Sequence, residues 1–378
     1  MGRSSMNIGV LTSSRADFGI YLPLLNALSN DPFFQLEVIA FGTHLSAGHG
    51  FTLHEIKNSF KGTIHEVPTL VSDKDAHAVA RSYSDVVSTF SELWGRQKYD
   101  LVLCLGDRYE MNAAVNAGIP YGVKFAHFHG GEKTLGAFDN IYRHQITLAS
   151  SFHFTATEEF AARVNELLDA EKKYVFSVGS LSISDLESLS LRSREELNEL
   201  YSLPKKPFIL CTFHPETADP ANNPAYAEEM VKALESIPES QHLVISLPNA
   251  DTNGNIYRNK LNILKEQKPD RYTLVENFGK TNYFSAMQHC SFLLGNSSSG
   301  IIEAASFGKY VIDVGERQKG RLTSGNVFHV PFEHEAIGEM VTQMIDRNET
   351  FSGQNKYVRP DTVSKTVEIL RSIGNGEI

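Results

Sequence analysis

The sequence has few cysteines and no long apolar run. Its 378 residues include only Cys104, Cys211 and Cys290, and no CxxC pair occurs. Three scattered cysteines argue against a disulfide framework and against a zinc site. We predict that all three are buried free thiols, because cysteine in strand-like runs such as LVLCLG and FILCTF behaves as a small hydrophobe. No segment approaches the roughly 18 consecutive apolar residues of a membrane helix, so we expect no membrane-spanning topology.

The sequence also has fewer basic than acidic residues. Thirty-five Lys and Arg residues stand against forty-five Asp and Glu residues, which gives a net charge of −10. This balance opposes a general affinity for nucleic acid or for anionic membranes, so an anionic ligand would need a local site. Residues 1–19 lack the apolar core and cleavage site of a signal peptide, and we therefore expect a cytoplasmic protein. No GxGxxG follows the first strand-like run, which disfavours NAD and FAD.

Short β-rich runs alternate with amphipathic stretches along the whole chain, a pattern typical of parallel sheets covered by helices. The clearest helix is expected at 78–97, where apolar residues recur every three or four positions. A serine-rich stretch at 180–193 separates two such series. We predict an α/β protein with two Rossmann-like, doubly wound domains facing a cleft, at 1–180 and 194–378. The last amphipathic stretch, 362–374, could end the second domain or cross back to the first.

The expected strands can be read directly from the sequence. In the first half they are NIGVLT, QLEVIAFG, TIHEVPT, DLVLCLG, KFAHFHG, FHFTAT and YVFSVG. In the second half they are PFILCTF, HLVISLPN, YTLVEN, SFLLGN and YVIDVG. Ligands of open parallel sheets gather beyond the carboxyl ends of the strands, so the polar residues that follow each run are the candidates for a site.

One candidate site follows the SFLLGN run. The sequence GNSSSG at 295–300 leaves a strand and opens a predicted helix through 308, so its backbone N–H groups and helix dipole would suit a diphosphate. The alternative is an ordinary serine-capped helix. Glu303, in the same predicted helix, could accept ribose hydroxyls, and Arg317 and Arg321 after the next strand could bind phosphate. Together these residues favour a nucleotide or a nucleotide sugar.

The first half contributes carboxylates at strand ends. Asp107, Glu132 and Asp139 lie near Arg108 and Arg143, so they could serve as general acids or bases. The alternative is that they form surface ion pairs or helix caps.

Histidines are also common near the strand ends. His127 and His129 lie on one expected strand, and we predict that they form no metal site. We expect His144 to cap or to pack. His214 ends a strand before Pro215, and it could bind phosphate or transfer a proton rather than sit as a core histidine.

The motifs RAD, GDR, HGGE, FHPET, GNSSSGIIE and DVGERQKGR occur in this order. Over nearly its whole length the chain resembles the hydrolysing UDP-N-acetylglucosamine 2-epimerases of sialic-acid and legionaminic-acid biosynthesis. The resemblance rests most on the ordered set of GDRYE, HGGEKTLGAFDNIYRH, GNSSSGIIE and ERQKGR. The GGE that is followed by Asp and by Arg-His matches the hydrolysing form better than the non-hydrolysing one.

The resemblance implies a glycosyltransferase-B-like pair of domains in which UDP binds mainly to the second. It implies that UDP contacts come from Arg15, His214, Asn249, Ser297, Ser298, Glu303 and Arg317, and that Asp107, Glu132 and Asp139 surround the sugar. We count His214 among the catalytic candidates, and Arg108, Arg143 and Arg321 among the substrate-binding ones.

The implied reaction removes the C2 proton as UDP leaves C1. Water then adds to the resulting 2-acetamidoglucal to give N-acetylmannosamine. No metal or other cofactor is implied, and we expect a homodimer or homotetramer. In one departure from the family pattern, Asn140 follows Asp139 where relatives often have a second aspartate.

Three alternatives stay open. The chain could transfer the sugar to an acceptor, or it could bind a nucleotide sugar without turnover. It could also perform the same elimination on the UDP-linked 2,4-diacetamido-2,4,6-trideoxy sugar of the legionaminic-acid route.

Overall fold

The computed structural model describes residues 5–49, 51–72, 75–169, 174–248 and 253–378. The chain divides into two compact units. Unit 1 comprises residues 1–132, 139–187 and 357–378, and unit 2 comprises residues 133–138 and 188–356. The chain therefore leaves unit 1 after Glu132 and re-enters it at Asp139. In unit 2, Leu135 N donates to Lys319 O at 3.0 Å.

Unit 1 is built on a parallel sheet of seven strands in the order β3-β2-β1-β4-β5-β6-β7. The strands are β1 (Met6–Thr12), β2 (Phe34–Ala40), β3 (Thr63–Glu66), β4 (Leu101–Leu105), β5 (Phe125–Phe128), β6 (Phe152–Thr155) and β7 (Val175–Ser177). All seven were predicted from the apolar runs. Every residue of β4 is buried, as expected of a parallel strand that helices cover on both faces.

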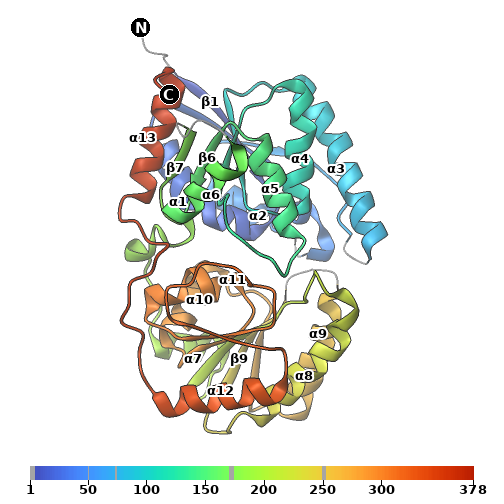
Figure 1. The fold of residues 1–378 in the computed structure, drawn as a ribbon, viewed down its shortest axis with the longest axis vertical. Helices are drawn as coiled ribbons and strands as arrows, with labels where there is room; N and C mark the ends of the chain where they lie inside the picture. Colours follow the sequence, from blue (N-terminus) through green and yellow to red (C-terminus); the bar gives the residue numbers. More distant parts are fainter. Residues whose placement is uncertain (1–4, 50, 73–74, 170–173, 249–252) are drawn as a thin grey trace. The chain divides into compact units, whose positions relative to one another are not determined.

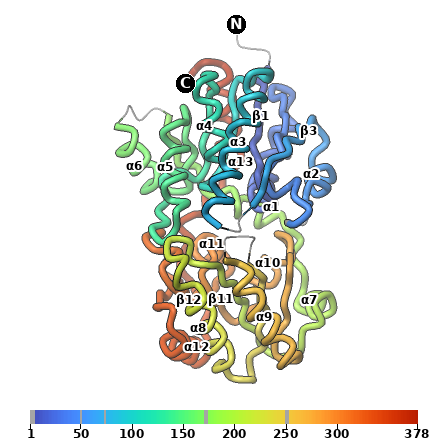
Figure 2. Tube along the Cα trace, turned by 90° about the vertical axis from the view of Figure 1, so that its right-hand side faces the viewer, coloured from blue at the N-terminus to red at the C-terminus, as the bar shows by residue number. Residues whose placement is uncertain are grey.

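The helices of unit 1 lie against this sheet (Figure 1). They are α1 (Arg15–Ser29), α2 (Leu53–Ser59), α3 (Ala76–Arg96), α4 (Tyr109–Gly118), α5 (Asp139–Ala149), α6 (Glu158–Leu168) and α13 (Thr362–Asn375). Helix α3, which packs beside α4 (Figure 2), confirms the helix expected at 78–97. Asp75 caps it, and its buried residues Ser82, Val86, Phe90 and Trp94 recur every four positions, which forms one apolar stripe.

The last helix, α13, belongs to unit 1 and packs on α1. Leu370 is fully buried in the core of that unit. Arg371 donates to Asp31 and also lies over the ring of Phe33 at 4.7 Å. Burial thus holds α13 against α1, and the ion pair ties it to the segment that follows α1.

Unit 2 repeats the plan with a parallel sheet in the order β10-β9-β8-β11-β12-β13. Its strands are β8 (Phe208–Thr212), β9 (His242–Ser246), β10 (Tyr272–Val275), β11 (Leu293–Gly295), β12 (Val311–Val314) and β13 (Val327–Val330). Its helices are α7 (Arg194–Tyr201), α8 (Asn223–Ser236), α9 (Gly254–Gln267), α10 (Gly279–His289), α11 (Ser298–Ile302) and α12 (His334–Arg347). The first five strands were predicted, and β13 was missed.

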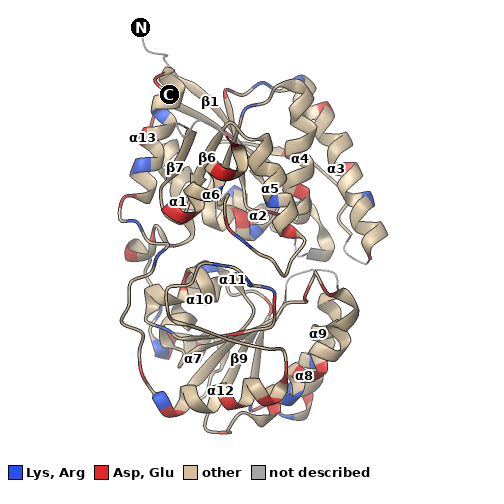
Figure 3. Ribbon diagram, viewed as in Figure 1, with Lys and Arg blue, Asp and Glu red and all other residues tan. Residues whose placement is uncertain are grey.

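Charged side chains lie mostly on helices and loops, while the strands of both sheets carry few (Figure 3). The three cysteines are buried free thiols, as predicted. Burial raises the pKa of Cys104 and of Cys290 to about 12, which makes both thiols poor nucleophiles. No helix in the described part of the chain is long and apolar enough to cross a membrane.

Candidate active site

Arg143 joins the carboxylate of Asp107 to the backbone of Glu132 in unit 1. It lies on α5 and is 2% exposed. Its Nη2 donates to Asp107 Oδ2, and its Nη1 donates to Glu132 O at 3.1 Å. Asp107 follows β4 and Glu132 follows β5, so the carboxyl ends of two adjacent strands meet on one buried guanidinium. A planar guanidinium with several donors can fix both loops at once.

The turn after β5 carries a second polar pair. His129 Nδ1 lies 2.9 Å from Glu132 Oε1. The side chains are 11% and 3% exposed. His129 has a φ of 63°, a left-handed conformation that is uncommon outside glycine. Gly131 has a φ of 81°, and a Cβ there would lie 2.3 Å from Phe160 O, so the second glycine of HGGE is required by space as well as by backbone conformation.

His127 supports the neighbouring loop rather than presenting a reactive group. Its Nε2 donates to Gly106 O at 2.9 Å, and its Nδ1 lies 3.0 Å from Thr147 Oγ1. Complete burial lowers the pKa of His127 to about 3, so the ring is neutral at pH 7 and holds the residue before Asp107 in place. Among the described residues, no group of His, Cys, Asp and Glu side chains could hold a metal ion.

The remaining unit 1 candidates lie at helix starts or on α5. Arg15 is the first residue of α1, and burial lowers its pKa. Asp139 is the first residue of α5. Arg108 pairs with the buried carboxylate of Glu110, with Nη2 and Oε1 3.0 Å apart. His144 Nε2 lies 3.4 Å from Asn140 Nδ2. Arg108 thus pairs with a carboxylate outside the candidate set, and its role toward a substrate stays a prediction.

In unit 2, the GNSSSG segment makes a tight turn from β11 into α11. Gly295 has a φ of 135°, and a Cβ there would lie 1.9 Å from Thr212 O, so no other residue fits. Ser297 caps α11 by accepting from Ser299 N at 3.3 Å. The predicted continuous helix through 308 is wrong: α11 ends at Ile302 and a 3-10 turn follows at Ala304–Phe307. Glu303 is the residue between them.

Because α11 is short, its dipole contributes little to binding an anion. Five residues carry little macrodipole, so an anion beside Ser297 and Ser298 would depend on individual N–H groups at the helix start, and those of Ser299 and Gly300 already donate to Ser297.

Asn296 joins three motifs of unit 2. Its Oδ1 accepts from His214 N at 2.7 Å, and its Nδ2 donates to His214 O at 2.8 Å. Its own carbonyl accepts from Gln318 Nε2 at 2.9 Å. The side chains of Asn296 and Gln318 are buried. Hydrogen bonds therefore connect the HPET, GNSSSG and ERQKGR segments to one another. Sequence reasoning missed both residues, because a polar residue after a strand also occurs in ordinary turns.

Glu216 anchors the loop that carries Arg317, and it too was missed. Its Oε1 accepts from Glu316 N at 3.1 Å and from Arg317 N at 3.2 Å. Burial raises the pKa of Glu216 to about 7, although its bond from Arg317 opposes the rise. Arg317 and Arg321 both lie on this loop and are partly buried. Asn249 lies outside the described residues.

The raised pKa of Glu216 predicts a pH-dependent stability. An unfolded glutamate titrates near 4.5, so the stabilising effect of the protonated form is complete below that pH and is lost as the pH rises through about 7. Relative to Glu216→Gln, the native chain should lose roughly 2 to 4 kcal/mol of unfolding free energy between pH 4.5 and pH 8, at about 1.4 kcal/mol per pKa unit. Urea unfolding of both proteins across this range measures the difference. A constant difference would contradict the prediction.

The sequence matches one known family over most of its length. Residues 26–371 match the family described as UDP-N-acetylglucosamine 2-epimerase. The chain belongs to this family. It is 31% identical over 366 residues to polysialic acid biosynthesis protein P7 of Escherichia coli, covering 96% of this chain and 92% of that protein. It is 32% identical over 325 residues to GDP/UDP-N,N'-diacetylbacillosamine 2-epimerase (hydrolyzing) of Campylobacter jejuni, covering 86% and 84%.

A solved structure shares the fold of this epimerase-family chain. The UDP-GlcNAc 2-epimerase of Neisseria meningitidis, bound to UDP-GlcNAc, superposes with a TM-score of 0.80 at 17% identity. The match covers 97% of this chain and 99% of that one. The α/β architecture with two parallel sheets and a glycosyltransferase-B-like fold was thus predicted correctly.

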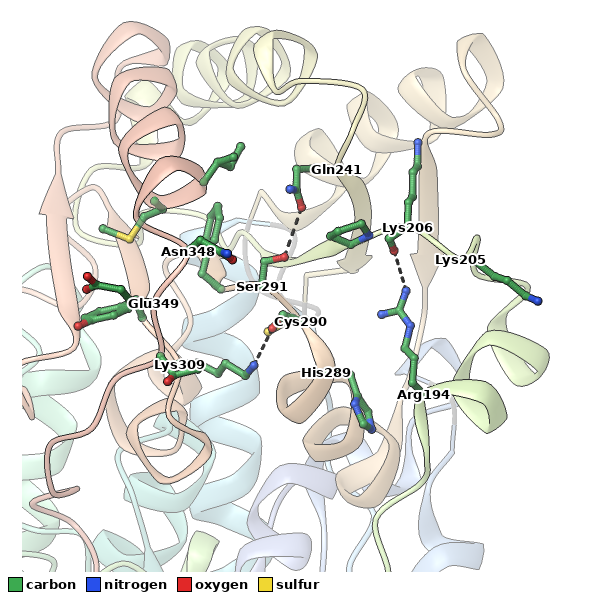
Figure 4. Close-up of a pocket in the computed structure, with 16 residues that line it drawn as sticks. Arg194, Lys205, Lys206, Gln241, His289, Cys290, Ser291, Lys309, Asn348 and Glu349 are labelled. Atoms are coloured by element: carbon green, nitrogen blue, oxygen red, sulfur yellow. Dashed lines mark hydrogen bonds between the residues drawn. The ribbon is translucent and has the colours of Figure 1, made fainter.

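A cavity of about 500 Å³ in unit 2 lies away from the motifs of the epimerase family (Figure 4). It is lined by residues that precede β8, β9, β11 and β12, such as Lys206, Gln241 and Lys309. Its cations bind main-chain carbonyls: Lys309 Nζ donates to Cys290 O at 2.7 Å, and Arg194 Nη2 donates to Lys206 O at 2.8 Å. Because ligands of parallel sheets gather at the opposite, carboxyl edge, we do not assign this cavity to the reaction.

Proposed function

We propose that this chain is a hydrolysing 2-epimerase that converts UDP-N-acetylglucosamine to UDP and N-acetylmannosamine. The observation that carries the proposal is the bridge from Arg143 to Asp107 and to the Glu132 backbone. It holds the carboxylate of Asp107 and the loop that carries Glu132 at the carboxyl ends of two adjacent strands, where a parallel sheet presents its ligand. A protein that only binds a nucleotide sugar has no need of such a cluster.

The chemistry requires groups of this kind. Elimination needs a base at C2 and stabilisation of charge on the departing diphosphate, and hydration of the glycal needs an acid and a base. In this proposal Asp107, Glu132 and Asp139 serve the sugar. No metal or redox group is part of the scheme.

Unit 2 and Arg15 hold the nucleotide in this proposal. The UDP contacts come from Arg15, His214, Asn249, Ser297, Ser298, Glu303, Arg317 and Arg321. The network of Asn296 and Glu216 supports the assignment of His214 and Arg317, because it fixes the backbone of both.

Replacing Arg317 by Ala should weaken UDP binding by about 1.5 to 3 kcal/mol, the range for a hydrogen bond to a charged group. The fold should survive, because the Arg317 contact with Glu216 is made by its backbone. Calorimetric titration with UDP measures the loss, and Lys319→Ala, an exposed neighbour on the same loop, is the matched control. Unchanged affinity in a folded Arg317→Ala protein would remove this arginine from the site.

A second substrate is supported by the relatives. The Campylobacter jejuni protein is named for N,N'-diacetylbacillosamine, which is 2,4-diacetamido-2,4,6-trideoxyglucose. The reaction at C1 and C2 is the same for both sugars, and discrimination depends on groups at C4 and C6. We keep this UDP-sugar as the second candidate.

Incubation of the purified chain with each UDP-sugar, followed by identification of the released sugar by NMR, tests the proposal. We expect UDP and a free sugar of manno configuration from one of the two. Release of a sugar with unchanged configuration would indicate simple hydrolysis. UDP binding without any free sugar would indicate a binding protein, or a transferase that lacks its acceptor.

A further inference from the structure

The pair of His129 and Glu132 defines the proton positions on the imidazole. Nδ1 lies 2.9 Å from Glu132 Oε1. A carboxylate accepts hydrogen bonds, so Nδ1 carries the hydrogen and Nε2 presents its lone pair. A carboxylate that fixes the tautomer of a neighbouring imidazole in this way, and that stabilises the imidazolium, is a common support for a general base.

The imidazole is the more accessible member of the pair. The His129 side chain is 11% exposed, and that of Glu132 is 3% exposed. Within the described residues, Nε2 has no hydrogen-bond partner, and it is not among the fully covered polar atoms. Glu132 is instead enclosed, with its carbonyl bound by Arg143. A ligand at the carboxyl edge of this sheet would therefore meet Nε2 more readily than the carboxylate.

The backbone holds this orientation. His129 N donates to Phe154 O at 3.0 Å, and the residue then turns left-handed with a φ of 63°. Gly131 is packed against the Phe160 backbone, and Arg163 donates to Gly131 O. Left-handed non-glycine residues persist where the surroundings determine them, and they cluster at functional sites.

We infer that His129 Nε2 removes the C2 proton in the reaction proposed above, with Glu132 acting through the imidazole. This inference rests on the proposed function. The proton passes to Nε2, the C2–H electron pair forms the C1=C2 bond, and the C1–O bond breaks with its electrons going to UDP. The imidazolium then releases the proton to solvent.

Inversion at C2 requires a second group for the hydration. The new proton must reach C2 from the opposite face, so a different acid donates it as water bonds to C1. That acid is restored by the proton that the water loses. Asp107 follows the adjacent strand and is held by Arg143, which makes it the candidate for this step.

Two substitutions at position 129 separate proton transfer from positioning. Asparagine tolerates the left-handed backbone and can place a nitrogen donor near Glu132, but it has no base in place of Nε2. Glycine tolerates the same backbone and removes the side chain. We expect His129→Asn and His129→Gly each to lower kcat at least about 100-fold, the scale of lost acid–base catalysis, with UDP affinity within about twofold. The exposed His77→Asn is the matched control.

Chemical rescue distinguishes a catalytic role of the His129 ring from a purely structural one. Added imidazoles should restore part of the turnover of His129→Gly, and the rescued rate should rise with the basicity of the imidazole. Near-normal turnover of His129→Asn would show that the ring only positions Glu132, and rescue without dependence on basicity would also overturn the inference. If the native chain releases no epimerised sugar, the proposed function fails as well. If the native chain releases epimerised sugar and His129→Asn turns over at a similar rate, only this inference fails.

Discussion

Replacing Glu132 by Gln is expected to lower turnover by two to four orders of magnitude, the range for the loss of acid–base catalysis. Glutamine fills the same space and can still accept from His129, but it carries no charge to stabilise a protonated imidazole. The loss should fall on kcat, while UDP binding stays within about twofold, because the proposed UDP contacts in unit 2 are untouched.

Steady-state kinetics and a UDP titration on the same preparation check this expectation. Glu158→Gln, on the exposed first turn of α6, is the matched control and should match the native rate. A Glu132→Gln enzyme with a turnover within about tenfold of the native value would contradict a role in proton transfer.

Replacing Asp107 by Asn should lower turnover at least about 100-fold while UDP still binds. Asparagine keeps one oxygen for Arg143 but cannot donate and recover a proton. The same change leaves Arg143 buried without its charged partner, so some stability should also be lost. Thermal unfolding measured beside kcat keeps the two effects apart.

Asp107→Glu is the informative companion. It retains the charge for Arg143 but moves the carboxylate by one methylene, so stability should be nearly kept and turnover should fall. Asp346→Asn, at an exposed position in α12, is the neutral control. Native turnover in Asp107→Asn would make Asp107 a structural residue.

The sheets could be predicted because parallel strands that are buried on both faces have continuous apolar sequences. β13 does not have this property. Its four residues, Val327–Val330, lie at the edge of the sheet, and His329 among them is exposed. The end of α11 could not be predicted either, because Ile301, Ile302 and the alanines after Glu303 favour a continuing helix. The change to a 3-10 turn depends on local packing.

The site was only partly readable. Strand ends identified Asp107 and Glu132, and Arg143 was named beside them, but the sequence did not show that its guanidinium binds both loops, because Arg143 lies 36 residues beyond Asp107 along the chain. His129 was read as the next residue of an alternating strand. The strand ends at Phe128 and His129 turns left-handed, so a strand pattern could not show where its side chain lies. Asn296 and Glu216 act on backbone groups of other motifs, which no pattern in the sequence reveals.

The proposed reaction requires that a proton leave C2 and be replaced. The reaction should be run to completion in deuterium oxide, and the released sugar should be examined by NMR and mass spectrometry. We expect one solvent deuterium at C2 of the released sugar, in the manno configuration, because elimination removes the original hydrogen and hydration supplies a new one. A sugar that keeps its original hydrogen at C2, with unchanged configuration, would contradict elimination and return hydrolysis or glycosyl transfer to first place.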